Sequence, residues 1–225
     1  TLPMAIDITE GYTTRRENVV LTKKAQSFEF KTSVKPQLVN VDADKLLLAE
    51  FKDAKTEENY IVQFNNAKNL MDKVQALDYF GGLETQSLGI KTVLNNSLSD
   101  KFWYVQQKGL GLIDSKDLKG SVLSKVLDLS ANAEKTSVQA EAYYLLAELY
   151  YDTEIYTSSK YYYDSTLTVL AESDERKAEV ESRSIKLKEI AENIETITLQ
   201  DSLIRISKMN EEERMALALS IREND

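Results

Sequence analysis

The residues of this chain that could perform chemistry are carboxylates that lie close together in the sequence. Asp42 and Asp44 form one pair, and Glu211, Glu212 and Glu213 form a run. Paired carboxylates can act as acid and base in glycoside hydrolysis, and all-oxygen ligands can hold Mg²⁺. The same spacings suit helix N-termini, where a carboxylate accepts backbone N–H bonds and is favoured by the helix dipole. We interpret both groups as helix-start signals and predict no catalytic site, metal site or cofactor.

The residue types that the chain lacks exclude most other catalytic chemistry. The sequence contains no cysteine and no histidine, so thiolate nucleophiles, histidine general bases and histidine zinc motifs are all missing. A net charge of −9 and a pI near 4.8 argue against nucleic acid or an anionic membrane as partner. The longest apolar runs are too short to span a bilayer. The expected partner is another protein, with no nucleic acid and no direct membrane insertion of this segment.

A change of composition near residue 135 indicates more than one domain. Up to Lys135 there are 18 basic and 18 acidic residues, and after it 10 basic and 19 acidic. All 7 glycines also precede that point. We predict a boundary within 131–137 and three segments: a β-strand segment at 1–41, a HEAT-like helical segment at 42–135 and a tetratricopeptide-like helical segment at 136–225.

Alternating apolar residues indicate short strands at the start of the chain. Residues 4–8 alternate between apolar and other side chains, and Phe28 and Phe30 alternate with charged neighbours. Turn-forming residues at 11–14 separate the first two runs. We predict a three- or four-stranded antiparallel piece that ends near Val41.

The apolar spacing then becomes helical. A short helix is expected from Asp42 or Asp44 through Phe51, followed by one long helix from Thr56 to Gly81. Further helices are expected around residues 88–98, 99–113 and 118–127, with Gly109 allowing close helix contact and the Phe102–Trp103 pair assigned to the core. The predicted fold class is mainly α: a short antiparallel β piece followed by an α-solenoid of HEAT-like and then tetratricopeptide-like helix pairs.

Two stretches of the first half carry a family resemblance. KPQLVNVDADKLLLAEFKDAKTEENYIVQFNNAKNLMDKVQAL contains P-x-x-V-x-x-D before a helical region, and LSDKFWYVQQKGLGLI places Asp100, Phe102, Trp103, Gln106 and Gly109 in order. Residues 2–129 thereby resemble the C-terminal part of M1 zinc aminopeptidases, whose pattern D-x-F-W-x-x-R-x-x-A has an arginine at the position of Gln106. The HExxH helix, glutamate and tyrosine on which that family's activity rests would lie before Thr1. The resemblance therefore implies an accessory, structural role.

The second half resembles one tetratricopeptide repeat. In AEAYYLLAELYYDTEIYTSSKYYYDSTLTVL, Leu146 and Ala147 fall at the large and small positions of the first helix, and Tyr150 at its aromatic position. Ser159 and Tyr163 then occupy the small and bulky positions of the second helix. These residues are expected to pack the two helices together.

Tyrosines crowd into this repeat, and some of them must be exposed. A tyrosine ring offers apolar area and a hydroxyl at low entropic cost, which suits a partner surface. The alternative is that the rings pack helices in a longer array. The candidate partner surface consists of Tyr143, Tyr144, Tyr151, Tyr156, Tyr161 and Tyr162.

The last part of the chain is expected to form a long packing helix after Asp174 and a further helix capped by Asn210 and Glu213. With YYYDSTL, QDSLIRISKM and NEEER, residues 140–225 resemble tetratricopeptide lipoproteins of the Bacteroidetes gliding-motility and type IX secretion machinery. That resemblance implies a periplasmic or outer-membrane-associated location. A signal or lipid-anchoring cysteine would then lie outside this chain.

The expected function is a non-catalytic helical scaffold for protein–protein interaction, such as a component of that machinery. The alternative is an accessory segment of an M1-family aminopeptidase that lacks the catalytic domain. Two resemblances that meet where the composition changes suggest a composite chain, and a natural fusion, a chimera and joined fragments all remain open.

Overall fold

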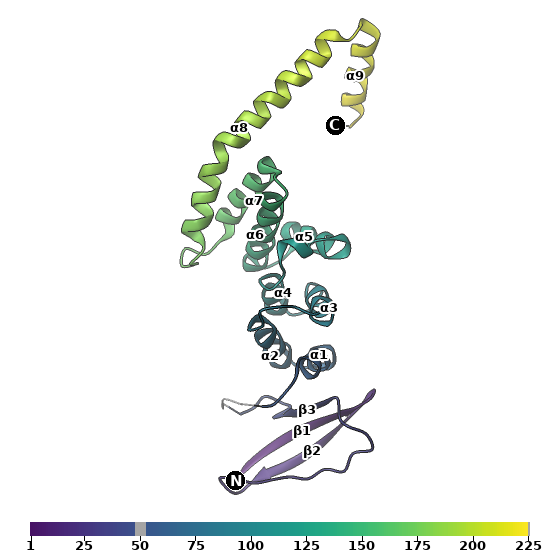
Figure 1. Ribbon diagram of the computed structural model, residues 1–225, viewed down its shortest axis with the longest axis vertical. Coiled ribbons are helices and arrows are strands. Elements are labelled where there is room, and N and C mark those ends of the chain that lie inside the picture. Colours follow the sequence, from purple (N-terminus) through teal and green to yellow (C-terminus); the bar gives the residue numbers. More distant parts are fainter. Residues whose placement is uncertain (48–52, 225) are drawn as a thin grey trace. The chain divides into compact units, whose positions relative to one another are not determined.

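The computed structural model describes residues 1–47 and 53–224 (Figure 1). These residues begin with a three-stranded antiparallel sheet of order β2-β1-β3. β1 (Leu2–Glu10) pairs with β2 (Thr13–Leu21) along its whole length, and β3 (Leu38–Val41) pairs with the other edge of β1. The hairpin turns at Gly11, whose φ of +60° is readily adopted by a residue without a Cβ. The predicted antiparallel sheet is confirmed.

One face of this sheet carries a small apolar core. Ile6, Ile8 and Val19 are buried together, and Phe28 and Phe30 pack against them. The expected strand around these phenylalanines is wrong, because residues 22–37 form no strand. Both edges of β1 are already paired, and the segment covers the apolar face of the sheet instead. The alternation of apolar and charged residues at 28–30 therefore reflects two phenylalanine rings that pack on the sheet from a loop.

Helices follow the sheet, but the single long helix expected from Thr56 is two helices. Ala67 has an extended conformation (φ −63°, ψ 128°), and the Asn69 side chain accepts a hydrogen bond from the backbone N–H of Asp72, which caps the second helix. Met71 is consequently 52% exposed, although it was expected in the apolar stripe. The helices are α1 (Glu57–Asn66), α2 (Leu70–Gly81), α3 (Leu88–Ser97), α4 (Trp103–Leu110) and α5 (Gly120–Asn132), with a 3₁₀ turn η1 (Ser115–Asp117) before α5.

The short helix expected before Phe51 lies partly outside the described residues. Residues 43–47 are not helical, and 48–52 are not described. The Asp42 carboxylate nevertheless accepts hydrogen bonds from the backbone N–H groups of Leu46 (3.2 Å) and Leu47 (3.0 Å). This is the type of contact expected of it.

The described chain divides into two compact units, Thr1–Leu145 and Leu146–Asp225. In the first unit α1 packs against α2 and α3 against α4, around a core that includes Phe80, Ile90 and Leu94. The division falls within α6 (Thr136–Asp152), and the second unit continues with α7 (Tyr156–Val169), α8 (Lys177–Lys208) and α9 (Glu211–Asn224). The chain is mainly helical with an N-terminal sheet and helices packed in pairs, as predicted.

The packing expected for the tyrosine-rich helix pair is present in the second unit. Leu146, Ala147, Ser159 and Tyr163 are completely buried. The Ser159 hydroxyl donates to the carbonyl oxygen of Ala147 at 3.0 Å. The two helices therefore touch at small residues, which satisfies a buried hydroxyl at the same time.

α8 packs against α7 through only part of its length (Figure 1). Val180, Leu187 and Ala191 are buried, whereas the later apolar residues of the helix are not. At the start of α9, Asn210 and Glu213 exchange hydrogen bonds of 2.9 Å with each other's backbone N–H, which confirms the predicted cap. No helix of the described chain has the length and apolar character needed to span a bilayer.

Candidate functional site

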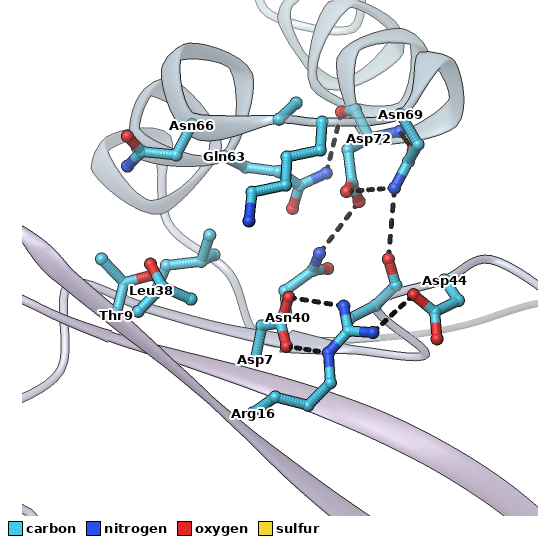
Figure 2. A pocket seen from close by; sticks show the side chains of 14 residues that line it. Asp7, Thr9, Arg16, Leu38, Asn40, Asp44, Gln63, Asn66, Asn69 and Asp72 are labelled. Atoms are coloured by element: carbon cyan, nitrogen blue, oxygen red, sulfur yellow. Dashed lines mark hydrogen bonds and ion pairs between the residues drawn. The ribbon is translucent and has the colours of Figure 1, made fainter.

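A polar cavity of about 450 Å³ lies in the first unit, between the sheet and the helices α1 and α2. Figure 2 shows side chains of β1, β2 and β3 on one side of it and side chains of α1 and α2 on the other. The cavity faces the side of the sheet opposite the apolar core, because side chains alternate along β1. Carboxylates, carboxamides and one guanidinium dominate its walls.

Arg16 is the main cation on the sheet side. It lies directly opposite Asp7 in the hairpin, and its Nε and Nη2 atoms donate to the two Asp7 carboxylate oxygens at 2.7 and 3.0 Å. Nη1 donates to Asp44 Oδ1 at 2.8 Å. These two carboxylates raise the pKa of Arg16 above its ordinary value. The guanidinium is held in place by protein carboxylates and is occupied by them.

Asp72 is the corresponding anion on the helix side, and its side chain is only 6% exposed. Its Oδ1 accepts from Asn40 Nδ2 and lies 3.0 Å from Lys45 Nζ, while Oδ2 accepts from Asn69 Nδ2 at 2.8 Å. Lys45 also donates to Asn40 Oδ1 at 2.9 Å. This network bridges β3 and α2, and it compensates a carboxylate that burial would otherwise penalise.

Gln63 lies at the wall of the same cavity and is 1% exposed. Its amide donates to the Asp72 carbonyl oxygen and to Gln75 Oε1, both at 2.9 Å, which fixes the orientation of the side chain. Within the described residues its own Oε1 has no hydrogen-bond partner. The cavity therefore offers one buried acceptor, while its three carboxylates already have partners.

In this arrangement the carboxylates hold neighbouring elements of the fold together. Asp42 caps a backbone turn and Asp44 pairs with Arg16, so the two carboxylates singled out in the sequence have separate structural roles. The Glu211–Glu213 run lies at the start of α9, where Glu213 completes the cap. No group of acidic residues in the described part of the chain is arranged to hold a metal ion. The sequence reading missed Arg16 and Asp72 as the centres of this network.

The tyrosines proposed as a partner surface fall into different environments. Tyr151 and Tyr161 are 42% and 63% exposed. Tyr143 and Tyr144 belong to the first unit, since the division follows Leu145. The remaining half-buried members are Tyr156 and Tyr162.

Ring contacts hold the tyrosines of the second unit. Tyr162 stacks in parallel on Tyr150 with 5.4 Å between ring centroids, and Tyr161 meets Tyr162 edge to face at 5.1 Å. Tyr151 meets Tyr156 edge to face at 6.1 Å. Two ring clusters thus connect α6 and α7, so these tyrosines serve the helix pair as well as exposing ring area.

A charged network ties Tyr163 to α8. The Tyr163 hydroxyl donates to Glu148 Oε1 at 2.5 Å, and Arg183 Nη1 donates to the Tyr163 hydroxyl oxygen at 2.8 Å and to Glu148 at 2.7 Å. The Arg183 guanidinium also lies 5.5 Å from the centre of the Tyr151 ring. Burial, followed by the hydrogen bond to Glu148, raises the pKa of Tyr163 above its ordinary value of 10.0.

We expect Tyr163→Phe to lower the free energy of unfolding by about 1–2 kcal/mol at neutral pH. The hydroxyl's hydrogen bonds with Glu148 and Arg183 are both lost, while those two side chains stay paired with each other. Tyr163 keeps its proton to higher pH in the folded state than in the unfolded chain. Its stabilisation is therefore complete below pH 10.0 and is lost as the pH rises above that value. Urea unfolding measures the free energy of unfolding of the parent chain and of Tyr163→Phe at neutral pH and above pH 10.0. The difference between the two should be smaller above pH 10.0 than at neutral pH. Tyr12→Phe, at a fully exposed side chain, is the control.

Comparisons with protein-family models, with curated proteins and with solved structures find no significant match to this chain.

Proposed function

We propose that the chain is a non-catalytic helical scaffold whose helix α8 binds an amphipathic helix of another protein. The observation that carries this proposal is a row of exposed isoleucines on α8. Ile190, Ile197 and Ile204 are 43%, 57% and 51% exposed and follow one another at intervals of seven residues. Side chains at that spacing lie on one side of a helix, as in the seam of a coiled coil.

The residues around this row indicate the partner's chemistry. Ile194 lies between the first two isoleucines on the same side, and Lys186 and Lys208 lie one turn beyond the two ends of the row. Within the described residues neither lysine forms an ion pair, and both are exposed. A helix with an apolar stripe and acidic residues near both ends would complement this surface.

The expected interaction can be tested by using the purified, tagged chain to capture the partner protein. Ile197→Asp places a charge in the centre of the row and should abolish retention of the partner. Ile185→Asp is the matched control, because Ile185 is 73% exposed on another side of the same helix. The captured protein is then purified and titrated calorimetrically against both variants. We expect binding to be lost only with Ile197→Asp.

Two results would contradict this assignment. Equal binding by both variants would show that the isoleucine row is not the contact surface. A self-association of the chain, measured by light scattering and removed by Ile197→Asp, would show that the row binds a second copy. Tyr161→Ser in the same capture experiment tests whether the tyrosines contribute to the surface.

The resemblance to secretion and gliding lipoproteins would make such a partner a component of that machinery, and would place the scaffold in the periplasm or at the outer membrane. The alternative role is an accessory segment of a metalloaminopeptidase. It is favoured by Asp42, the last residue of the P-x-x-V-x-x-D stretch, whose carboxylate caps the backbone that follows. Hydrolysis of an aminoacyl-anilide by the purified chain, with loss of activity on chelation, would overturn the non-catalytic assignment.

A further inference from the structure

Trp103 is the only tryptophan of the chain, and its position differs from the expected one. It was assigned to the core, yet it is 45% exposed. Trp103 is the first residue of α4, whereas the buried residues of this helix, Val105, Gly109 and Leu110, lie further along it. A large aromatic side chain is therefore held at the surface.

The exposed indole forms one wall of a cavity of about 340 Å³ within the first unit. α4, the end of α5 and the residues leading into α6 supply the other walls. Ligand sites in proteins commonly measure about 300–1,000 Å³, so the space suits a small molecule. Trp103 contacts Tyr104 edge to face, with 5.6 Å between ring centroids and 76° between ring planes. This contact restricts the indole and favours a fixed aromatic wall.

Two carboxamide side chains, Gln106 and Asn132, line the same cavity as the indole and are held by hydrogen bonds. Asn132 Nδ2 donates to Asp128 Oδ1 at 2.8 Å across one turn of α5. Gln106 Nε2 donates to the carbonyl oxygen of Asp100 at 2.8 Å. A ligand that meets side chains held in this way loses less free energy in ordering them.

The charges at this cavity balance. Asp128 and Glu134 contribute two carboxylates, and Lys101 and Lys135 contribute two ammonium groups. The remaining carboxylate, Asp100, is paired with Lys73. An anion would meet the two carboxylates and a cation the two ammonium groups, so the surroundings favour neither. The hydroxyl groups of a neutral ligand can donate hydrogen bonds to the carboxylates and accept hydrogen bonds from the ammonium groups.

We propose that the Trp103 cavity binds a neutral saccharide. The apolar C–H face of a pyranose ring packs on the electron-rich face of the indole. Its hydroxyl groups donate to Asp128 and Glu134, and they accept from Asn132 and Lys135. This site lies in the first unit and is independent of the helix surface proposed on α8.

Because the chain has a single tryptophan, its fluorescence reports binding directly at this site. The intact chain is titrated with glucose, galactose, maltose and lactose, and in parallel with choline as a cation and glucuronate as an anion. At least one neutral sugar should shift or quench the emission in a saturable manner, and choline and glucuronate should not.

Variants localise the effect. Asn132→Ala changes an exposed side chain and should weaken sugar binding by at least about tenfold. Trp103→Ala should abolish sugar binding, which is measured for this variant by calorimetry. Ser124→Ala, at an exposed position of α5 outside the cavity, is the matched control and should bind as the parent chain does.

Circular dichroism verifies that each variant is folded. Failure of all four sugars to bind the intact chain, a preference for choline or glucuronate, or sugar binding unaffected by Asn132→Ala would each overturn the proposal.

Discussion

We expect Gly109→Ala to lower the free energy of unfolding by about 3 kcal/mol, because a Cβ at this glycine would make a closer contact than a Cβ at any other glycine of the chain. A Cβ at this position would lie 1.9 Å from Ser97 Oγ and 2.9 Å from Ser97 Cβ. Ser97 is completely buried, and its hydroxyl donates to the Leu94 carbonyl oxygen at 2.7 Å, so it cannot turn away. The helices α3 and α4 would have to separate.

The cause of this loss can be verified by removing the opposing side chain. Ser97→Gly combined with Gly109→Ala should recover a large part of the stability, although Ser97→Gly alone costs about 1 kcal/mol. Gly111→Ala is the control, because a Cβ there would meet its nearest atom at 3.7 Å, an ordinary contact. Chemical denaturation measures all four proteins. Additive losses in the double variant would show that Ser97 is not the obstacle.

The glycine at 109 was predicted from the sequence to allow close helix contact, and the structure confirms the contact. The partner residue could not be predicted, since the pairing of α3 with α4 brings together residues twelve positions apart in sequence. In the aminopeptidase-like pattern this position is an alanine. Here the volume of that methyl group is occupied by the side chain of Ser97.

Local patterns predicted those parts of the fold in which a residue interacts with its own neighbourhood. The strand alternation, the Asn210–Glu213 cap and the small-residue contact of Ala147 with Ser159 all follow from short spacings. The break between α1 and α2 was missed because the apolar stripe continues through Ala67. The cap formed by Asn69 decides that break, and its signal is a single side chain.

The polar network at the sheet shows the same limit. The Asp7–Arg16 pair could have been found, because a two-residue turn at Gly11 places these residues opposite each other. Asp72 carried no such signal, since its partners on β3 and beyond depend on how the sheet meets α2. Trp103 was misplaced because a two-residue aromatic pair does not reveal which of its members faces the core.

Exposed and buried features of the chain point to different uses of its two units. The first unit has a polar network between the sheet and α2 and a separate cavity walled by an exposed indole. The second has a helix that exceeds its packing partner in length and leaves an apolar row uncovered. The two proposals, a protein-binding surface in the second unit and a saccharide site in the first, therefore rest on separate residues and can be tested independently.

We expect Asp72→Ala to destabilise the chain by about 3 kcal/mol or more, because it leaves the ammonium group of Lys45 and the amide of Asn40 without their buried acceptor. Asp78→Ala on the same helix is the control. The Asp78 side chain is 57% exposed and paired with Lys108 at the surface, so its loss should cost less than about 1 kcal/mol.

A second variant distinguishes the cost of the lost hydrogen bonds from the cost of leaving the Lys45 ammonium group without its carboxylate partner. Replacing Lys45 by methionine in the Asp72→Ala background removes the uncompensated ammonium group and should restore part of the stability. Urea denaturation of the single and double variants measures both contributions. If Asp72→Ala cost no more than Asp78→Ala, the network between β3 and α2 would be a consequence of the packing and not one of its causes.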